Sequence, residues 1–153
     1  MSGQGSNSRQ ALSRELSEFC MSYSLSEEGL RELIERHRWE PQNNLNISNY
    51  DFFLEACQNE NANEGIIRCL LEYFPAAISA TDDEGHSPLH LACWNENITL
   101  DIVQLLIDAA PNSVRTEDND SLMPLHHFCW NNDVDEITAM EILKLLVEKC
   151  PES

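Results

Sequence analysis

The stretch from Gly85 to Asn97 reads G-H-S-P-L-H-L-A-C-W-N-E-N, and parts of it recur on both sides at an interval of 36 residues. On the C-terminal side, Pro88-Leu89-His90 and Cys93-Trp94-Asn95 reappear as Pro124-Leu125-His126 and Cys129-Trp130-Asn131. On the N-terminal side, Ala92-Cys93 and Asn95-Glu96-Asn97 match Ala56-Cys57 and Asn59-Glu60-Asn61. Self-similarity at a fixed period of this size is typical of a stacked repeat array.

Each repeat reads as a helix, a short turn, a second helix and a polar loop. Asp51, Asn63, Ser87 and Thr99 stand where helices should begin, and side chains of these types cap helix N-termini. Pro75, Pro111 and Pro151 follow the apolar second helices and should end them. No segment alternates like a strand, so we predict an all-α solenoid of antiparallel helix pairs. The three units are residues 46–81, 82–117 and 118–153.

The N-terminal third does not share this period. Residues 1–10 are polar, and we expect them to be disordered. Residues 11–45 predict a helical extension that covers one end of the array. Its first helix has apolar residues at helical spacing, Leu12, Leu16, Phe19 and Cys20. Ser24 and Glu27 have the spacing of a capping box that opens a second helix, and Pro41 should end that helix.

The second unit resembles the ankyrin repeat, whose motif is roughly D-x-x-G-x-T-P-L-H-x-A-A followed by an apolar second helix. The resemblance covers about residues 46–153. It implies that the following residues form the repeat framework: Gly85, Ser87, Pro88, Leu89, His90, Ala92, Cys93, Pro124, Leu125, His126 and Cys129. It also implies a non-catalytic protein-interaction scaffold that binds a polypeptide on its concave face and loop tips.

The third unit departs from the motif at two positions. Ser121 replaces the loop glycine, and a side chain in a left-handed turn costs on the order of 1 kcal/mol. Met123 replaces the capping Ser or Thr, at a further cost of about 1 kcal/mol. We therefore expect the second unit to be better formed than the third.

The resemblance places candidate contact residues at two sets of positions. At the ends of the first helices these are Trp94, Asn95, Trp130 and Asn131, and at the loop tips they are Asp83, Glu84, His86, Asn119, Asp120 and Leu122. The two tryptophans leave two alternatives: exposed binding anchors, or rings buried by the longer turn. Identical residues in register usually serve packing, which favours burial.

The histidines and cysteines of the repeats could serve either a metal or catalytic site or the repeat framework. His90 with Cys93 and His126 with Cys129 could form a Cys2His2 zinc site, or a redox pair, if stacking brought them together. The resemblance instead gives these histidines inter-repeat backbone bonds, and free cysteine packs as a small apolar side chain. The sequence has no phosphate-binding loop, nucleophile elbow or paired metal-binding helix. We therefore expect no metal, no cofactor and no enzymatic activity.

Charge constrains the partner. The net charge is −18, and all but one unit of it falls on residues 39–153. This field opposes nucleic acids and anionic membranes and favours a basic protein partner, although it also serves solubility. The chain shows neither a signal peptide nor a membrane span, so we expect an intracellular protein, cytoplasmic or nuclear, with reduced cysteines. The uncovered apolar last helix predicts either self-association through the C-terminal face or a regulatory fragment of a larger protein.

Overall fold

A computed structural model of the chain describes residues 3–37 and 50–149, with side chains described from residue 11 onward. Two expectations lie outside these residues: the end of a helix at Pro41 and the end of another at Pro151. The described residues form eight α-helices and two 3-10 turns, with no strand among them. Because every regular element is helical, the predicted all-α class is confirmed.

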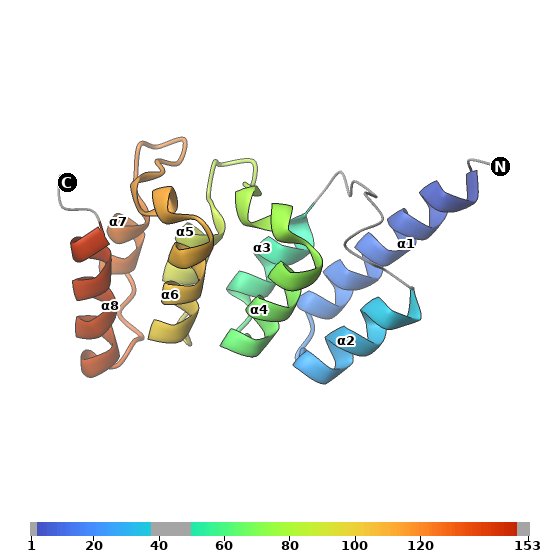
Figure 1. Cartoon of the computed structure of the whole chain (residues 1–153). Helices are drawn as coiled ribbons and strands as arrows, with labels where there is room; N and C mark the ends of the chain where they lie inside the picture. Colours follow the sequence, from blue (N-terminus) through green and yellow to red (C-terminus); the bar gives the residue numbers. More distant parts are fainter. Residues whose placement is uncertain (1–2, 38–49, 150–153) are drawn as a thin grey trace.

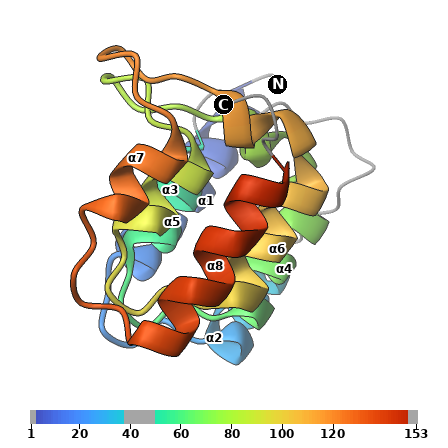
Figure 2. The same ribbon diagram turned by 90° about the vertical axis from the view of Figure 1, so that its left-hand side faces the viewer.

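The helices form four antiparallel pairs, each packed against the next (Figure 1). The pairs are α1 (Gly3–Cys20) with α2 (Glu27–Arg36), α3 (Asp51–Gln58) with α4 (Glu64–Tyr73), α5 (Pro88–Trp94) with α6 (Leu100–Ala109), and α7 (Pro124–Cys129) with α8 (Glu136–Lys149). Figure 2 shows the odd-numbered helices in one row and the even-numbered helices in another. The loops before α5 and α7 project beyond the odd-numbered row (Figure 2).

The second helix of each of the first three pairs begins at a side-chain cap. Ser26, Asn63 and Thr99 have extended backbones, and each accepts a hydrogen bond from the backbone N–H three residues on. Asn63 and Thr99 are the predicted caps, whereas the predicted cap at Ser24 is wrong. Leu25 is buried and belongs to the core, so the chain turns into the helix only after it, at Ser26.

Two further helix boundaries can be compared with the sequence. The prolines act as predicted: α4 and α6 stop two residues before Pro75 and Pro111, and each proline opens a 3-10 turn, η2 (Pro75–Ser79) or η3 (Pro111–Arg115). The predicted cap at Asp51 is wrong by one position. Asp51 is the first residue of α3, and Tyr50 precedes it without a side-chain cap. A carboxylate in the first turn still favours the helix through its dipole.

Helix α1 begins at Gly3, where we expected disorder over residues 1–10. Leu12, Leu16 and Cys20 bury the C-terminal half of α1 against the stack. Once those turns are docked, each further residue adds a helical hydrogen bond without repeating the cost of nucleation. The polar composition of residues 3–10 therefore does not prevent their helical conformation.

Asparagine side chains join the four pairs in sequence. The side-chain amide of Asn95 donates to the carbonyls of Cys57 and Asn59, at 3.1 and 2.9 Å, in the preceding pair. Asn131 makes the same two bonds to Cys93 and Asn95, at 3.0 and 3.1 Å. Asn59 repeats the pattern one layer earlier, on Cys20 and Ser22, at 2.7 and 2.9 Å. The pair α1–α2 therefore occupies the first layer of the stack, a role that the sequence analysis missed.

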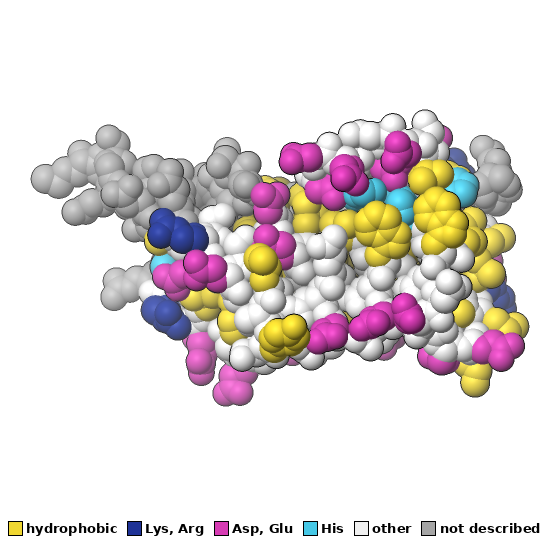
Figure 3. All heavy atoms as spheres, turned by 180° about the vertical axis from the view of Figure 1, so that it is seen from behind, with side chains coloured by type: hydrophobic (Ala, Val, Ile, Leu, Met, Phe, Trp, Pro, Cys, Tyr) yellow, Lys and Arg dark blue, Asp and Glu magenta, His cyan; other side chains and the backbone are white. Residues whose placement is uncertain are grey.

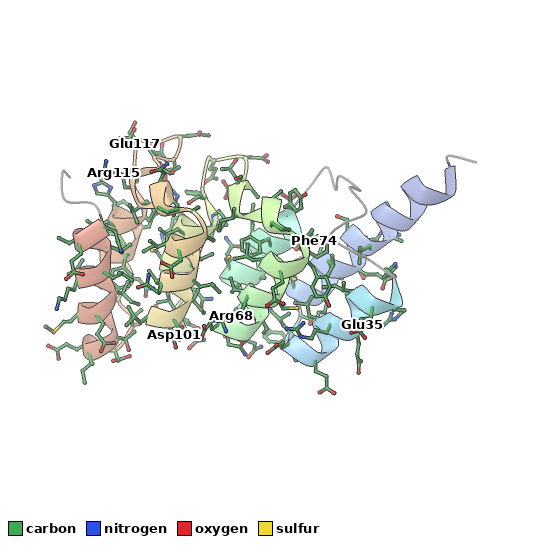
Figure 4. All side chains as sticks on the ribbon, in the orientation of Figure 1. Glu35, Arg68, Phe74, Asp101, Arg115 and Glu117 are labelled. Carbon is green, nitrogen blue, oxygen red and sulfur yellow. The ribbon has the colours of Figure 1, made fainter. Side chains whose placement is uncertain are left out.

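One hydrophobic core runs through all four layers. Phe52 and Phe74 meet edge to face with ring centroids 5.0 Å apart (Figure 4). The last layer is open on its outer side, where α8 exposes Ile137, Met140, Leu143 and Val147. Among the described residues, no helix combines the length and hydropathy that a bilayer crossing needs.

Candidate protein-binding site

Two acidic loops precede α5 and α7, and both close in the same way. Asp82 accepts hydrogen bonds from the N–H groups of Glu84 and His86, each at 2.9 Å. Asp118 accepts from Asp120 and Leu122 at 2.9 and 3.0 Å. Gly85 has φ +83° in the first loop, and Ser121 has φ +63° at the equivalent position of the second. The repeat period therefore sets the loop geometry even where the glycine is replaced.

The two loops are bonded to each other. The backbone N–H of Asn119 donates to the carbonyl of Glu84 at 2.9 Å. Its side-chain amide donates to the backbone carbonyl of Asp83 at 3.1 Å. Asp83, Glu84, Asn119 and Asp120 remain exposed, as the contact prediction requires. The amide of Asn119 is occupied, however, so this residue serves the loop-to-loop junction.

His90 holds α5 to the next layer. Its Nδ1 accepts from the Ser87 N–H at 3.1 Å, and its Nε2–H donates to the Leu122 carbonyl at 2.9 Å. The inter-repeat bond that the resemblance implied is therefore confirmed. His126, the equivalent residue in α7, accepts from the Met123 N–H at 2.9 Å and is exposed. Met123 provides no side-chain cap, whereas Ser87 does.

Trp94 and Trp130 are 44% and 61% exposed, so the preference for burial is wrong. The extra turn residues do not fold back over them. Instead, both rings pack on buried histidines. Figure 3 shows hydrophobic side chains beside histidines on this face. His127 meets Trp94 and Trp130 edge-on, with ring centroids 4.6 and 5.8 Å apart, and His86 lies 4.8 Å from Trp94. The tryptophans therefore have one supported face and one free face.

The structure gives three of the predicted contact residues another role. The side-chain amides of Asn95 and Asn131 are directed at the preceding layer, and Asn95 is only 7% exposed. His86 is also buried, at 3% exposure. These three side chains support the surface rather than form it, because the two asparagine amides bond to the preceding layer and His86 is buried.

A groove of about 680 Å³ runs along the ends of the odd-numbered helices. Trp94 borders it on one side, and the exposed side chains of Met21 and Tyr23 border it on the other. Four carboxylates line it: Glu55, Glu60, Glu96 and Asp133. No lysine or arginine is among the described residues that line it. Aromatic side chains and carboxylates therefore line the groove together.

The histidine–cysteine pairs do not assemble as zinc ligands in these layers. Burial raises the pKa of the Cys93 thiol, which disfavours the thiolate that zinc requires. Both nitrogens of His90 are already bonded. Burial likewise raises the pKa of Cys57, and it raises that of Cys20 to about 12. Among the described cysteines, only Cys129 is exposed.

His127 is a buried polar residue that the sequence analysis placed in no site. Its Nε2 lies 2.7 Å from the carboxylate of Asp118 in the preceding loop. Burial alone would raise the pKa of Asp118, but bonds from Leu122, His127 and Asp120 lower it to about 2. The sequence signal was a histidine at the position where the previous unit has the core residue Leu91.

Repeated helix pairs, loops projecting on one side and a groove along one helix row define a helical repeat solenoid. The model of the ankyrin repeat family matches residues 19–117 in three copies, so the chain belongs to this family. Ankyrin repeats indicate a protein–protein interaction domain and are typically non-catalytic. A comparison with curated proteins found no match.

The family match also places the repeats along the chain. It begins at residue 19, well before the boundary at residue 46 drawn from the motif, and it ends at residue 117. This beginning agrees with the bonds from Asn59 that place α1 and α2 in the stack. Helices α7 and α8 lie beyond the match, yet they pack on α5 and α6 as a further layer.

Proposed function

We propose that this chain binds a polypeptide whose basic side chains enter the acidic groove while an apolar side chain covers Trp94 and Trp130. The observation that carries the proposal is the exposure of these two equivalent tryptophans, of which Trp94 lines the groove. Exposed tryptophans on rigid supports are the commonest binding anchors. The histidines behind the rings fix them before a partner arrives, which lowers the entropy cost of binding.

Charge supports a basic partner. Glu55, Glu60, Glu96 and Asp133 line the groove, and the exposed loop tips add Asp83, Glu84 and Asp120. Figure 3 shows acidic side chains on both sides of the aromatic patch. Figure 4 labels one cation near the loop tips, Arg115, beside Glu117. Such a surface accelerates encounter with cationic peptides and repels nucleic acid.

The test is selection of peptides from a random displayed library on the immobilised chain. Selected peptides should combine Lys or Arg with an aromatic or aliphatic residue, and their affinity should fall with added salt. Trp94→Ala and Trp130→Ala should each weaken binding at least tenfold, or about 1.4 kcal/mol. Ile137→Ala, an exposed apolar residue on α8, is the control. Peptides that bind the double tryptophan variant as well as the unchanged chain would refute the proposal.

A second proposal concerns α8, whose outer face would pair with a second copy of the chain. Leu143 and Val147 follow Val103 and Ile107 of α6 in register, and those two are buried beneath the next layer. A two-fold pairing would cover both copies of this face at once. Sedimentation should show a concentration-dependent dimer that Leu143→Glu abolishes. A monomer at all concentrations would refute it.

We place the chain inside the cell, in the cytoplasm or nucleus. The described cysteines are free, as expected in a reducing compartment. Expression with a fluorescent tag tests this placement, and secretion of the tagged chain would contradict it.

A further inference from the structure

Three buried side chains from three segments converge between the second and third units. His86 comes from the loop before α5, Asp118 from the loop before α7, and His127 from α7 itself. The Nε2 atoms of His86 and His127 lie 3.4 and 2.7 Å from Asp118 Oδ2. One ligand atom from each residue lies within 4.8 Å of the other two. Among the described residues, no other group of three or more His, Cys, Asp or Glu side chains is arranged in this way.

Asp82 fixes the tautomer of His86. The Nδ1 of His86 lies 2.9 Å from Asp82 Oδ2, so Nδ1–H donates to that carboxylate. The Nε2 lone pair then faces Asp118 Oδ2 across 3.4 Å. Two acceptors at this distance repel one another unless a proton or a metal cation lies between them. In protein metal sites, a ligating histidine usually donates its other N–H to a carboxylate, which orients the ring.

Both histidines replace apolar residues of the repeat. His127 stands in register with Leu91, and His86 stands in register with Leu122. Burying two imidazoles at positions where the other unit has leucine costs free energy unless their polar atoms are paired. The Nδ1 of His127 is buried and has no hydrogen-bond partner, so Nε2, which faces Asp118, is the nitrogen through which this ring makes its polar contact. The two departures from the repeat meet at one carboxylate.

We propose that His86, Asp118 and His127 bind a zinc ion that joins the second unit to the third. Two imidazoles and a carboxylate are zinc ligands, and three protein ligands leave a fourth position for water or a partner's side chain. Ligands about 2.0–2.2 Å from a tetrahedral ion lie roughly 3.3–3.5 Å apart. The gap between His86 and Asp118 already has this size.

The gap between His127 and Asp118 must widen by about 0.6 Å when zinc enters, given the same ligand distances. The ring of His127 stays neutral: its proton moves from Nε2 to Nδ1 by exchange with solvent, and the Nε2 lone pair then coordinates the ion. Asp82 and Asp118 supply two negative charges, and Glu84 Oε2 lies 3.8 Å from His86 Nδ1. The bound ion would be covered by Trp94, which packs on both histidine rings.

The experiment is calorimetric titration of the purified full chain with zinc chloride near pH 7.5. A Cys129→Ser background removes the exposed thiol. The proposal expects one zinc per chain, bound with a micromolar or lower dissociation constant. Thermal unfolding should shift upward with zinc, because the ion binds only the folded junction.

Variants locate the ion. His86→Leu and His127→Leu insert the residues found at the equivalent positions, so they should fold, and each should weaken zinc binding at least about 100-fold. Asp82→Asn keeps all three ligands but removes the acceptor of His86 Nδ1–H, and it should weaken binding about 10- to 100-fold. His126→Gln changes an exposed neighbour and should leave binding unchanged.

Three results would overturn the proposal. They are no binding at micromolar zinc, binding that survives both leucine substitutions, or binding that His126→Gln removes. Circular dichroism of each metal-free variant confirms that it is folded. The register-matched leucines and Asp82→Asn act through different atoms, so a folding defect in one variant leaves the others decisive.

Discussion

The second and third units have the same loop conformation, but different residues stabilise it. In the second, Gly85 provides the left-handed turn and Ser87 caps α5. In the third, Ser121 is forced into that turn and Met123 provides no side-chain cap. The third unit has Asp118 bonded to His127, a link for which the second has no counterpart. A repeat can thus keep its shape while a buried polar contact within the unit takes the place of local conformational fit.

The largest difference between the two units should appear on removal of the equivalent histidines. His90→Ala should destabilise the chain by about 3 kcal/mol, because it leaves the buried Ser87 N–H unpaired, removes one of two hydrogen bonds to the Leu122 carbonyl and opens a cavity. His126→Ala should cost about 0.5 kcal/mol, since that ring is exposed. Urea unfolding in the presence of a chelator measures both. Equal losses would show that the two units are held alike.

The loop glycine gives the next largest effect. Gly85→Ser should cost about 2 kcal/mol, because φ is +83° and a Cβ there would lie 2.6 Å from Asn119 Oδ1 and 3.0 Å from its backbone nitrogen. The clash involves the atoms that join the two loops. Thermal unfolding of this variant should be compared with that of Ser121→Ala, which keeps a side chain at the equivalent turn. A Gly85→Ser variant as stable as the unchanged chain would contradict this account.

The reverse exchange should stabilise the third unit. Ser121→Gly relieves the strain of φ +63°, partly offset by the greater freedom of glycine in the unfolded chain, for a net gain of about 0.5 kcal/mol. The midpoint of urea unfolding should rise. A lower midpoint would mean that the Ser121 side chain contributes more than its backbone strain costs.

The smallest effect is on pH dependence. Burial lowers the pKa of His90 below its ordinary value of 6.5, although the bond to the Leu122 carbonyl partly opposes this. The unfolded chain therefore takes up this proton at higher pH than the folded chain, and the stability from His90 is complete above pH 6.5 and declines below it. The difference in unfolding free energy between the unchanged chain and His90→Ala should narrow between pH 7.5 and 5. A difference that widens would contradict the assignment.

The period of the sequence predicts much of the fold because the repeated residues are those that make repeated bonds. Pro88-Leu89-His90 gives the start of α5 and the bond to the next layer, and Asn63 and Thr99 give the starts of α4 and α6. The first layer was not found by comparing the sequence with itself at an offset of 36 residues. Its spacing to the second is 37 residues, so a comparison at a fixed offset of 36 misses identical pairs such as Glu27 with Glu64, Arg31 with Arg68 and Leu33 with Leu70.

The candidate site could be predicted only in part. The register located Trp94 and Trp130 but could not show which face of each ring is free, because this depends on the path of the following turn. His127 was hidden by the same logic, since its register position is that of a core leucine. Its partner Asp118 lies in another segment, and only the folded chain brings them together.

Native-state hydrogen exchange tests most directly whether the layers are held unequally within one stack. The account predicts that, without metal, the amides of α5 and α6 exchange more slowly than the equivalent amides of α7 and α8. Exchange in α7 and α8 that is as slow as in α5 and α6, or slower, would contradict it.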